Sequence, residues 1–257
     1  MVSFSGHILP VVFTVLVWFF ATGLIAWLDN REHATFPRSL MIGGAMGIGG
    51  LVMILLAAQS VSAWAVYVAF AGALMVWAWH EIGFLTGATA GPRREACPPD
   101  ARGWARFSYA SMAVIYHEIG LAVTAVLLVS LCWMMPNQIG AMVFMLMFVL
   151  RLSTKLNLFV GVPNKQTDIL PGHLRYLTSY YGPQRLHPLM VLSFTAAAAL
   201  SAWLGHTAYT AAPGSPEMIG ASLLFALSVL GAAEHLFLAL PFRDGALWGW
   251  ALPSHRS

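Results

Sequence analysis

Charged side chains are scarce in this sequence: Asp, Glu, Lys and Arg make up 9% of its 257 residues, and hydrophobic residues make up 59%. Soluble globular domains carry about 25% charged residues, so this composition excludes a protein whose main solvent is water. The net charge of +3 is small, and the basic residues give no support for a nucleic-acid-binding surface.

Cysteine is scarce too, and the common catalytic and nucleotide-binding motifs are missing. Cys97 falls in a predicted cytoplasmic loop and Cys132 near the predicted outer end of the fourth span, so we expect two free thiols rather than a disulfide. There is no Walker loop, no dinucleotide fingerprint, no C-x-x-C, no nucleophile elbow and no helical repeat. The enzyme classes that depend on these motifs are excluded.

Long apolar stretches dominate what is present. Each is about 20 residues long, which at about 1.5 Å per residue crosses a hydrocarbon core of about 30 Å as a helix. We predict an all-α polytopic bundle, a single integral membrane domain over 1–257. Its predicted spans are 8–28, 39–58, 62–86, 109–133, 138–160, 188–206 and 217–240. We expect the first span to be a retained membrane helix and not a cleaved secretory signal, because no Lys or Arg precedes it and no cleavage pattern follows it.

The basic residues give the predicted orientation. Three connections, at 60–62, 136–138 and 212–216, contain neither Lys nor Arg, whereas the others and the C-terminal tail are basic. The positive-inside rule therefore places the N-terminus in the periplasm and the C-terminus in the cytoplasm, for a multi-pass protein of the cytoplasmic (inner) membrane.

Three predicted spans carry a His beside a Glu. The pairs are His80-Glu81, His117-Glu118 and Glu234-His235. All six lie at a similar predicted depth, about 8–13 Å from the cytoplasmic ends of their spans. Ionisable residues inside a membrane are costly, so this layer requires a reason. It suits a metal site for iron, zinc or manganese, in particular a di-metal centre with iron as first choice. It also suits axial ligation of a tetrapyrrole, or a structural network of hydrogen bonds.

A second group of polar residues lies at the end of the fifth span and in the loop after it. We single out Arg151, Lys155, Asn157, His173 and Arg175 as candidate cofactor-binding residues. The long basic side chains could reach lipid phosphate. They could instead pair with the glutamates of the layer, or hold the propionate of a pigment precursor, with His173 and Arg175 closing the site from the cytoplasm.

The second span contains a G-x-x-x-G motif at Gly43 and Gly47. Small residues at this spacing allow helices to approach closely. The motif serves packing either inside the bundle or between the subunits of a homo-oligomer.

Several polar strings resemble one known family. They are W-H-E-I-G-F-L-T-G, G-P-R-R, C-P-P, Y-H-E, R-L-S-x-K-L-N-L-F-x-G-V-P-N and L-P-x-H-L-R-Y-L. Together they are similar to the PuhE-type family of photosynthetic complex assembly proteins, over about residues 1–240. The resemblance implies a role in building the bacterial photosynthetic reaction centre and its light-harvesting antenna, with influence on bacteriochlorophyll supply. It brings no list of catalytic residues.

The sequence is compatible with three functions. We favour a non-enzymatic assembly factor that holds bacteriochlorophyll or a precursor, with membrane lipid and reaction-centre, light-harvesting or pigment-synthesis proteins as its partners. The alternative is a metal-dependent oxidase or hydroxylase acting on a tetrapyrrole. A transporter or proton relay ranks last, because the outer half of every predicted span is apolar and shows no path across the membrane.

Overall fold

The fold is that of a computed structural model, which describes residues 2–165, 167, 170–242 and 246–251. These residues contain seven helices long and apolar enough to cross a membrane, and no β-strand. The predicted all-helical, seven-span architecture is confirmed. The helices are α1 (Leu9–Asp29, continued from a π-helical turn at Phe4–Ile8), α2 (Phe36–Ala57), α3 (Ala63–Leu85), α4 (Gly103–Cys132), α5 (Ile139–Val160), α6 (Pro188–Thr210) and α7 (Pro216–Ala239).

Two helices, α4 and α6, extend four or more residues beyond their predicted spans, for reasons that hydropathy does not capture. Helix α4 begins six residues before position 109, and its added turn carries Arg106, which donates to the carbonyls of Phe159 and Tyr180. Helix α6 continues four residues past position 206. There Thr207 and Thr210 donate their hydroxyls to carbonyls of the preceding turn. In both cases polar side chains support helix outside the apolar stretch.

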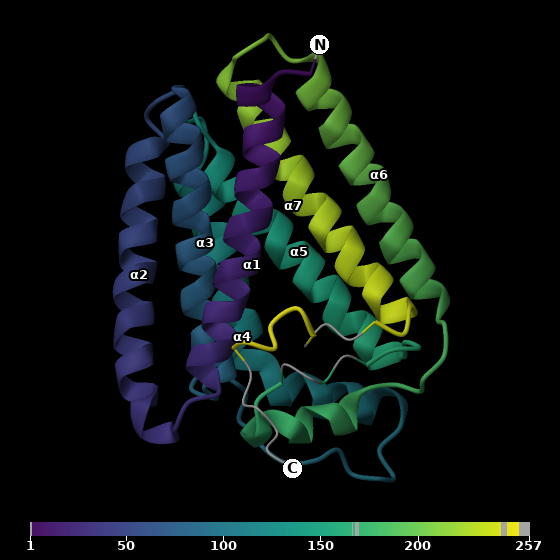
Figure 1. The fold of residues 1–257 in the computed structure, drawn as a ribbon. Coiled ribbons are helices and arrows are strands. Elements are labelled where there is room, and N and C mark those ends of the chain that lie inside the picture. The colour runs from purple at the N-terminus through teal and green to yellow at the C-terminus, as the bar shows by residue number, and fades with distance from the viewer. Residues whose placement is uncertain (1, 166, 168–169, 243–245, 252–257) are drawn as a thin grey trace.

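The helices run alternately up and down, so the C-terminal ends of α1, α3, α5 and α7 lie at the same end of the bundle (Figure 1). Helix α2 packs mainly on α3, and α6 mainly on α7. Helix α5 lies in the middle and contacts α3, α4, α6 and α7. The apolar core between them includes Phe70, Leu121, Phe144 and Leu223.

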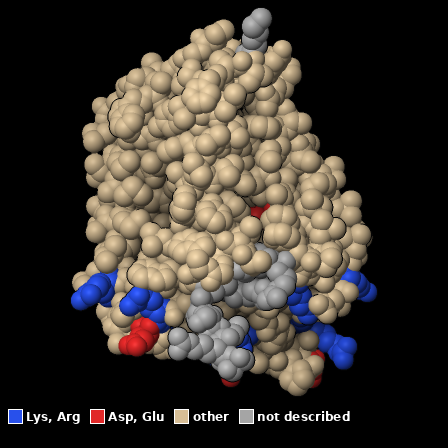
Figure 2. Space-filling model, in the orientation of Figure 1, with Lys and Arg blue, Asp and Glu red and all other residues tan. Residues whose placement is uncertain are grey.

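The charged side chains seen in Figure 2 gather at the end where α1, α3, α5 and α7 finish. The remaining visible surface is almost entirely uncharged. Large apolar side chains such as Leu56, Val126 and Leu192 are exposed on the outside of the helices, as expected for contact with lipid. That the charged end faces the cytoplasm remains the prediction of the positive-inside rule.

At the charged end, the loop after α3 and the 3₁₀ helix η3 (Gly172–Tyr180) form a cap over the bundle. Arg93 donates from Nε to the Tyr180 hydroxyl at 2.8 Å, and that hydroxyl donates to the carbonyl of Glu95 at 2.9 Å. Gly91 passes so close to α4 that a Cβ there would lie 1.9 Å from the carbonyl oxygen of Met112. The G-P-R-R string and the L-P-G-H-L-R-Y-L string therefore belong to one structural unit.

The G-x-x-x-G face of α2 packs inside the bundle. Gly43 faces Ile82, Gly47 lies against the Trp79 ring, and Gly50 meets the backbone of Gly72, all on α3. These glycines bring α2 and α3 together within one chain, so the motif needs no second subunit to explain it.

This packing predicts opposite outcomes at neighbouring glycines. A Cβ at Gly50 would lie 2.5 Å from the Gly72 carbonyl oxygen, so Gly50→Ala must push α2 away from α3. We expect its free energy of unfolding in detergent to fall by about 1–3 kcal/mol, as for overpacked cores. At Gly49 the nearest atom is 3.6 Å away, so Gly49→Ala is the matched control and should change little. Equal unfolding curves for the two variants would contradict this account of the α2–α3 interface.

Candidate functional site

A cavity of about 320 Å³ lies between α1, α3, α5 and α7. Trp18, Trp77 and Met147 form part of its apolar wall. Trp248, from the segment after α7, closes one side, donating from Nε1 to the carbonyl of Phe19 at 2.9 Å. This volume is at the lower end of the range typical of small-molecule sites, which combine apolar walls with a few polar groups.

The polar groups of the cavity are Glu81, Arg151, Glu234, Tyr181 and threonine hydroxyls. Arg151 Nη2 and Glu81 Oε2 form an ion pair at 3.3 Å. Glu81 is only 7% exposed, and its second oxygen, Oε1, has no hydrogen-bond partner among the described residues. Acidic atoms are visible through an opening in the uncharged face of Figure 2. The cavity is therefore amphipathic, with an acid–base pair set in an aromatic and aliphatic wall.

Asp29, the last residue of α1, belongs to the same region and was missed by the sequence reasoning. It is 2% exposed, neither carboxylate oxygen has a described hydrogen-bond partner, and its charge interacts with that of Glu81. The predicted first span ended at position 28, which assigned Asp29 to a loop. Asp29 lies one turn after Ile25, a cavity-lining residue of the same helix, and hydropathy gives no signal of this position.

Helix α5 holds the polar layer together through residues at alternate positions. Arg151 pairs with Glu81 of α3, and Lys155 pairs with Glu118 of α4. Two residues along a helix correspond to about 200°, so Ser153 and Asn157 point to the opposite side. Ser153 contacts His235 of α7, and Asn157 donates to Ser193 Oγ of α6, each at 2.9 Å. The string R-x-S-x-K-x-N thus links α5 to all four of the helices around it.

The three histidines of the layer differ in their hydrogen bonding. His235 donates from Nδ1 to the Gly231 carbonyl at 2.8 Å, because a carbonyl oxygen can only accept, and its Nε2 contacts the Ser153 hydroxyl at 2.9 Å. His80 contacts the Thr124 hydroxyl at 2.9 Å. His117 is 1% exposed, and in the described part of the chain neither of its ring nitrogens has a hydrogen-bond partner. Its Nε2 lies 4.0 Å from Glu81 Oε1.

The six predicted metal ligands share one layer but do not converge on a point. Among the described residues, no three His, Cys, Asp or Glu side chains are grouped so that they could hold one metal ion. Glu118 is paired with Lys155, and both nitrogens of His235 are engaged within the protein. Metal binding by this layer therefore stays a prediction without a geometric centre in the described part of the chain.

The candidate cofactor-binding residues separate into two regions. Of the five, only Arg151 lines the cavity. Lys155 and Asn157 make contacts between helices, as described above. His173 lies on η3, where its Nε2 contacts the Leu85 carbonyl at 2.8 Å, and Arg175 is exposed on the same element.

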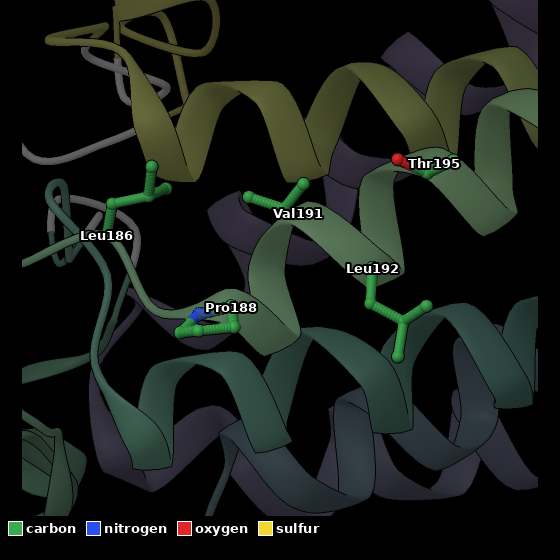
Figure 3. Close-up of a pocket in the computed structure, with 5 residues that line it drawn as sticks. All are labelled: Leu186, Pro188, Val191, Leu192 and Thr195. Atoms are coloured by element: carbon green, nitrogen blue, oxygen red, sulfur yellow. The ribbon is translucent and has the colours of Figure 1, made fainter.

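A second hollow, on the outside of α6, carries no comparable chemistry. Figure 3 shows the side chains that line it. They are Leu186, Pro188, Val191, Leu192 and Thr195. No charged residue is among them, so the cavity between α1, α3, α5 and α7 is the stronger candidate.

His173 makes the stability of the cap dependent on pH. Partial burial lowers the pKa of His173 below its ordinary value of 6.5, against the opposing effect of its bond to Leu85 and assisted by nearby His33. The folded state therefore favours the neutral ring, and stability is lost as pH falls below about 6.5. His173→Gln keeps a donor for Leu85 but does not titrate, so unfolding measured between pH 7.5 and 5 should depend less on pH. His206→Gln, at an exposed histidine of α6, is the control and should match wild type; a His173→Gln profile identical to wild type would contradict the assignment.

A family model described as "Protein of unknown function (DUF3623)" matches residues 4–257. A protein of Rhodobacter capsulatus described as "Uncharacterized 30.4 kDa protein in puhA 5'region" is 38% identical over 246 residues, which is 94% of this chain and 89% of that protein. No solved structure matches the chain.

Proposed function

Since the chain belongs to the DUF3623 family, with a relative described by its position in a puhA 5' region, we propose that it is a PuhE-type assembly factor for photosynthetic complexes. In this proposal it resides in the cytoplasmic membrane and holds bacteriochlorophyll or a late precursor for the reaction-centre and light-harvesting proteins. The observation that carries the proposal is the amphipathic cavity, because an acid–base pair set in an apolar wall suits a ligand with both apolar and polar parts.

The cavity suits part of an amphipathic tetrapyrrole. Its Trp and Met side chains offer contact to apolar rings or tails, while Arg151 and Tyr181 offer donors to carbonyl oxygens. A whole pigment exceeds a cavity of about 320 Å³, so the remainder would extend through the opening towards the lipid. In this role the protein binds and orients the pigment without changing any of its covalent bonds.

The histidines of the layer do not fit as axial ligands from this cavity. Among the described lining residues there is no histidine. His235 has both ring nitrogens bonded within the protein, and His117 is shut away from the cavity. Pigment recognition in this proposal therefore rests on the cavity walls and on the polar groups around Arg151.

The metal-dependent oxidase is the alternative, and its support is the layer of His and Glu residues. Two features weigh against it: basic residues of α5 pair with two of the three glutamates, and hydroxyls contact two of the three histidines. Through these contacts, most side chains of the layer join one helix to its neighbour.

The gene's deletion in a phototrophic bacterium separates the two functions. An assembly factor predicts that assembled complexes, measured by their near-infrared absorption in membranes, fall severalfold while no single pigment precursor accumulates. An oxidase predicts build-up of one defined precursor. Complexes at the parental level, with an unchanged pigment profile, would contradict the proposal.

A further inference from the structure

We infer that the indole of Trp248 holds the place of a flat ring of the ligand, in an aromatic recess on α1 that the pigment's ring system occupies when it binds. The inference rests on the proposed function and adds to it a subsite for a planar ring. Binding at this subsite displaces residues 246–251, which we call the C-terminal strap.

The C-terminal strap reaches the cavity from outside the seven helices. It follows α7 in the chain and returns to α1 (Figure 1). Trp248 is 3% exposed and lines the cavity, and Ala251 is buried beside it. A short connecting segment thus supplies one of the largest side chains of the cavity wall.

The recess that receives the indole has the shape of a flat aromatic ring. Trp18 meets the Trp248 ring edge to face, with 5.3 Å between the ring centroids, and Phe19 stacks on it at 6.1 Å and 27°. Gly23 leaves room on the same face, because a Cβ there would lie 2.9 Å from Trp248 Cδ1. Aromatic rings bind other flat π-systems in such stacked and edge-to-face arrangements. The recess therefore offers a chlorin ring the same kind of contacts that it offers the indole.

The recess and the cavity form one continuous space. Trp18 and Trp248 both line the cavity, and so does Ala26, which packs against Trp248. The indole therefore takes up room directly beside the space of about 320 Å³. That space is too small for a whole pigment. Moving the indole out enlarges it at the position where contacts for a flat ring already exist.

The strap can leave without disrupting the helices. Among the described residues, its one hydrogen bond to a helix runs from Trp248 Nε1 to the Phe19 carbonyl. That carbonyl lies inside α1 and also accepts from the amide four residues later, so it keeps a partner when Trp248 leaves. The end of α7 is held separately, because Asn164 donates to the carbonyls of Phe237 and Leu240. Displacement of the strap therefore leaves α1 and α7 intact.

A fixed wall and a displaceable ring predict opposite effects of removing the indole. If Trp248 is a wall, Trp248→Ala loses ligand contacts and binds more weakly. If the indole competes with the ligand, the apparent affinity is reduced by the fraction of chains whose recess is free, and Trp248→Ala removes this reduction.

The first test is therefore the affinity of the purified full chain in detergent for a metal-free chlorin, measured by titration of the chlorin's absorption. We expect Trp248→Ala to bind the chlorin at least fivefold more tightly than wild type. Trp203→Ala, at an exposed tryptophan of α6, is the matched control and should bind as wild type does.

A larger cavity alone could also tighten binding, so a second test follows the strap itself. Ala251→Cys, made together with Cys97→Ser, places a thiol at a buried position of the strap, which a maleimide should label slowly. We expect the chlorin to raise the labelling rate at least fivefold by displacing the strap. Hexadecanol has no flat ring and should leave the rate unchanged. Ala246→Cys, in the same background, starts at an exposed position and should show no change with the chlorin.

The results separate the inference from the proposed function. Equal or weaker binding by Trp248→Ala would overturn the inference, and so would a labelling rate at position 251 that the chlorin leaves unchanged or lowers. A rise with hexadecanol as large as that with the chlorin would also overturn it. In each case, chlorin binding by the wild type would leave the proposed function in place. Chlorin binding by neither wild type nor Trp248→Ala would overturn both.

Discussion

Replacing Arg151 by methionine is expected to lower the free energy of unfolding by about 1–3 kcal/mol, since it leaves the buried carboxylate of Glu81 without its half-buried partner. The remaining partner, Glu81, is 7% exposed, lies near Asp29, and has no second cation among the groups lining the cavity that the structure describes. The substitution keeps most of the apolar volume of the side chain, so lost packing contributes little. Equilibrium unfolding in mixed micelles measures the effect.

The matched variant is the double substitution Arg151→Met with Glu81→Gln. It removes both charges, so it should recover most of the stability that Arg151→Met loses. Arg151→Lys keeps the charge and should cost less than Arg151→Met. A double variant less stable than Arg151→Met would contradict the view that an uncompensated carboxylate is the cause.

Filling the cavity is expected to abolish binding of the pigment. Ala78 of α3 lines the cavity and is buried, so a tryptophan side chain there would occupy much of the space of about 320 Å³. We expect Ala78→Trp to weaken binding of a chlorin to the purified chain at least tenfold, measured by titration of the chlorin's absorption.

Two further variants keep this result interpretable. Thr22→Trp fills the cavity from α1 and should have the same effect. Loss of binding in both variants could not be explained by a distortion of α3 alone. Ala199→Trp adds the same side chain on an exposed position of α6 and should bind as wild type does. Wild-type affinity in folded Ala78→Trp and Thr22→Trp would place the pigment elsewhere.

Much of the fold followed from the sequence, because each span is an apolar stretch bounded by polar, Pro or Gly residues. Seven helices and their alternation required no knowledge of tertiary contacts. The early start of α4 did, since it depends on Arg106 reaching the carbonyls of Phe159 and Tyr180. A hydropathy profile contains no information about such a contact.

The candidate site was only partly predictable. Depth along the helices placed the His–Glu pairs in one layer, but depth does not give rotation, and adjacent residues diverge by about 100°. Glu81 therefore turns to Arg151 and the cavity, while His80 turns to Thr124. The cavity itself depends on how α1, α3, α5 and α7 pack and on the return of Trp248 to the bundle, neither of which leaves a local pattern.

The R-x-S-x-K-x-N string of α5 makes the same point. The sequence suggested three kinds of partner for its basic residues: lipid phosphate, a cofactor, or the glutamates of the layer. In the structure its side chains reach Glu81, His235, Glu118 and Ser193 on four different helices. Only Arg151 keeps a place at the cavity, so the string serves mainly to hold the bundle together around the site.

The pigment content of the protein tests the central claim most directly. The full chain would be purified in mild detergent from a phototrophic host, and its pigment-to-protein ratio measured by absorption and amino-acid analysis. The account predicts about one tetrapyrrole per chain, and much less in Ala78→Trp purified in parallel. A folded wild-type protein without pigment, from cells that are making it, would contradict the account.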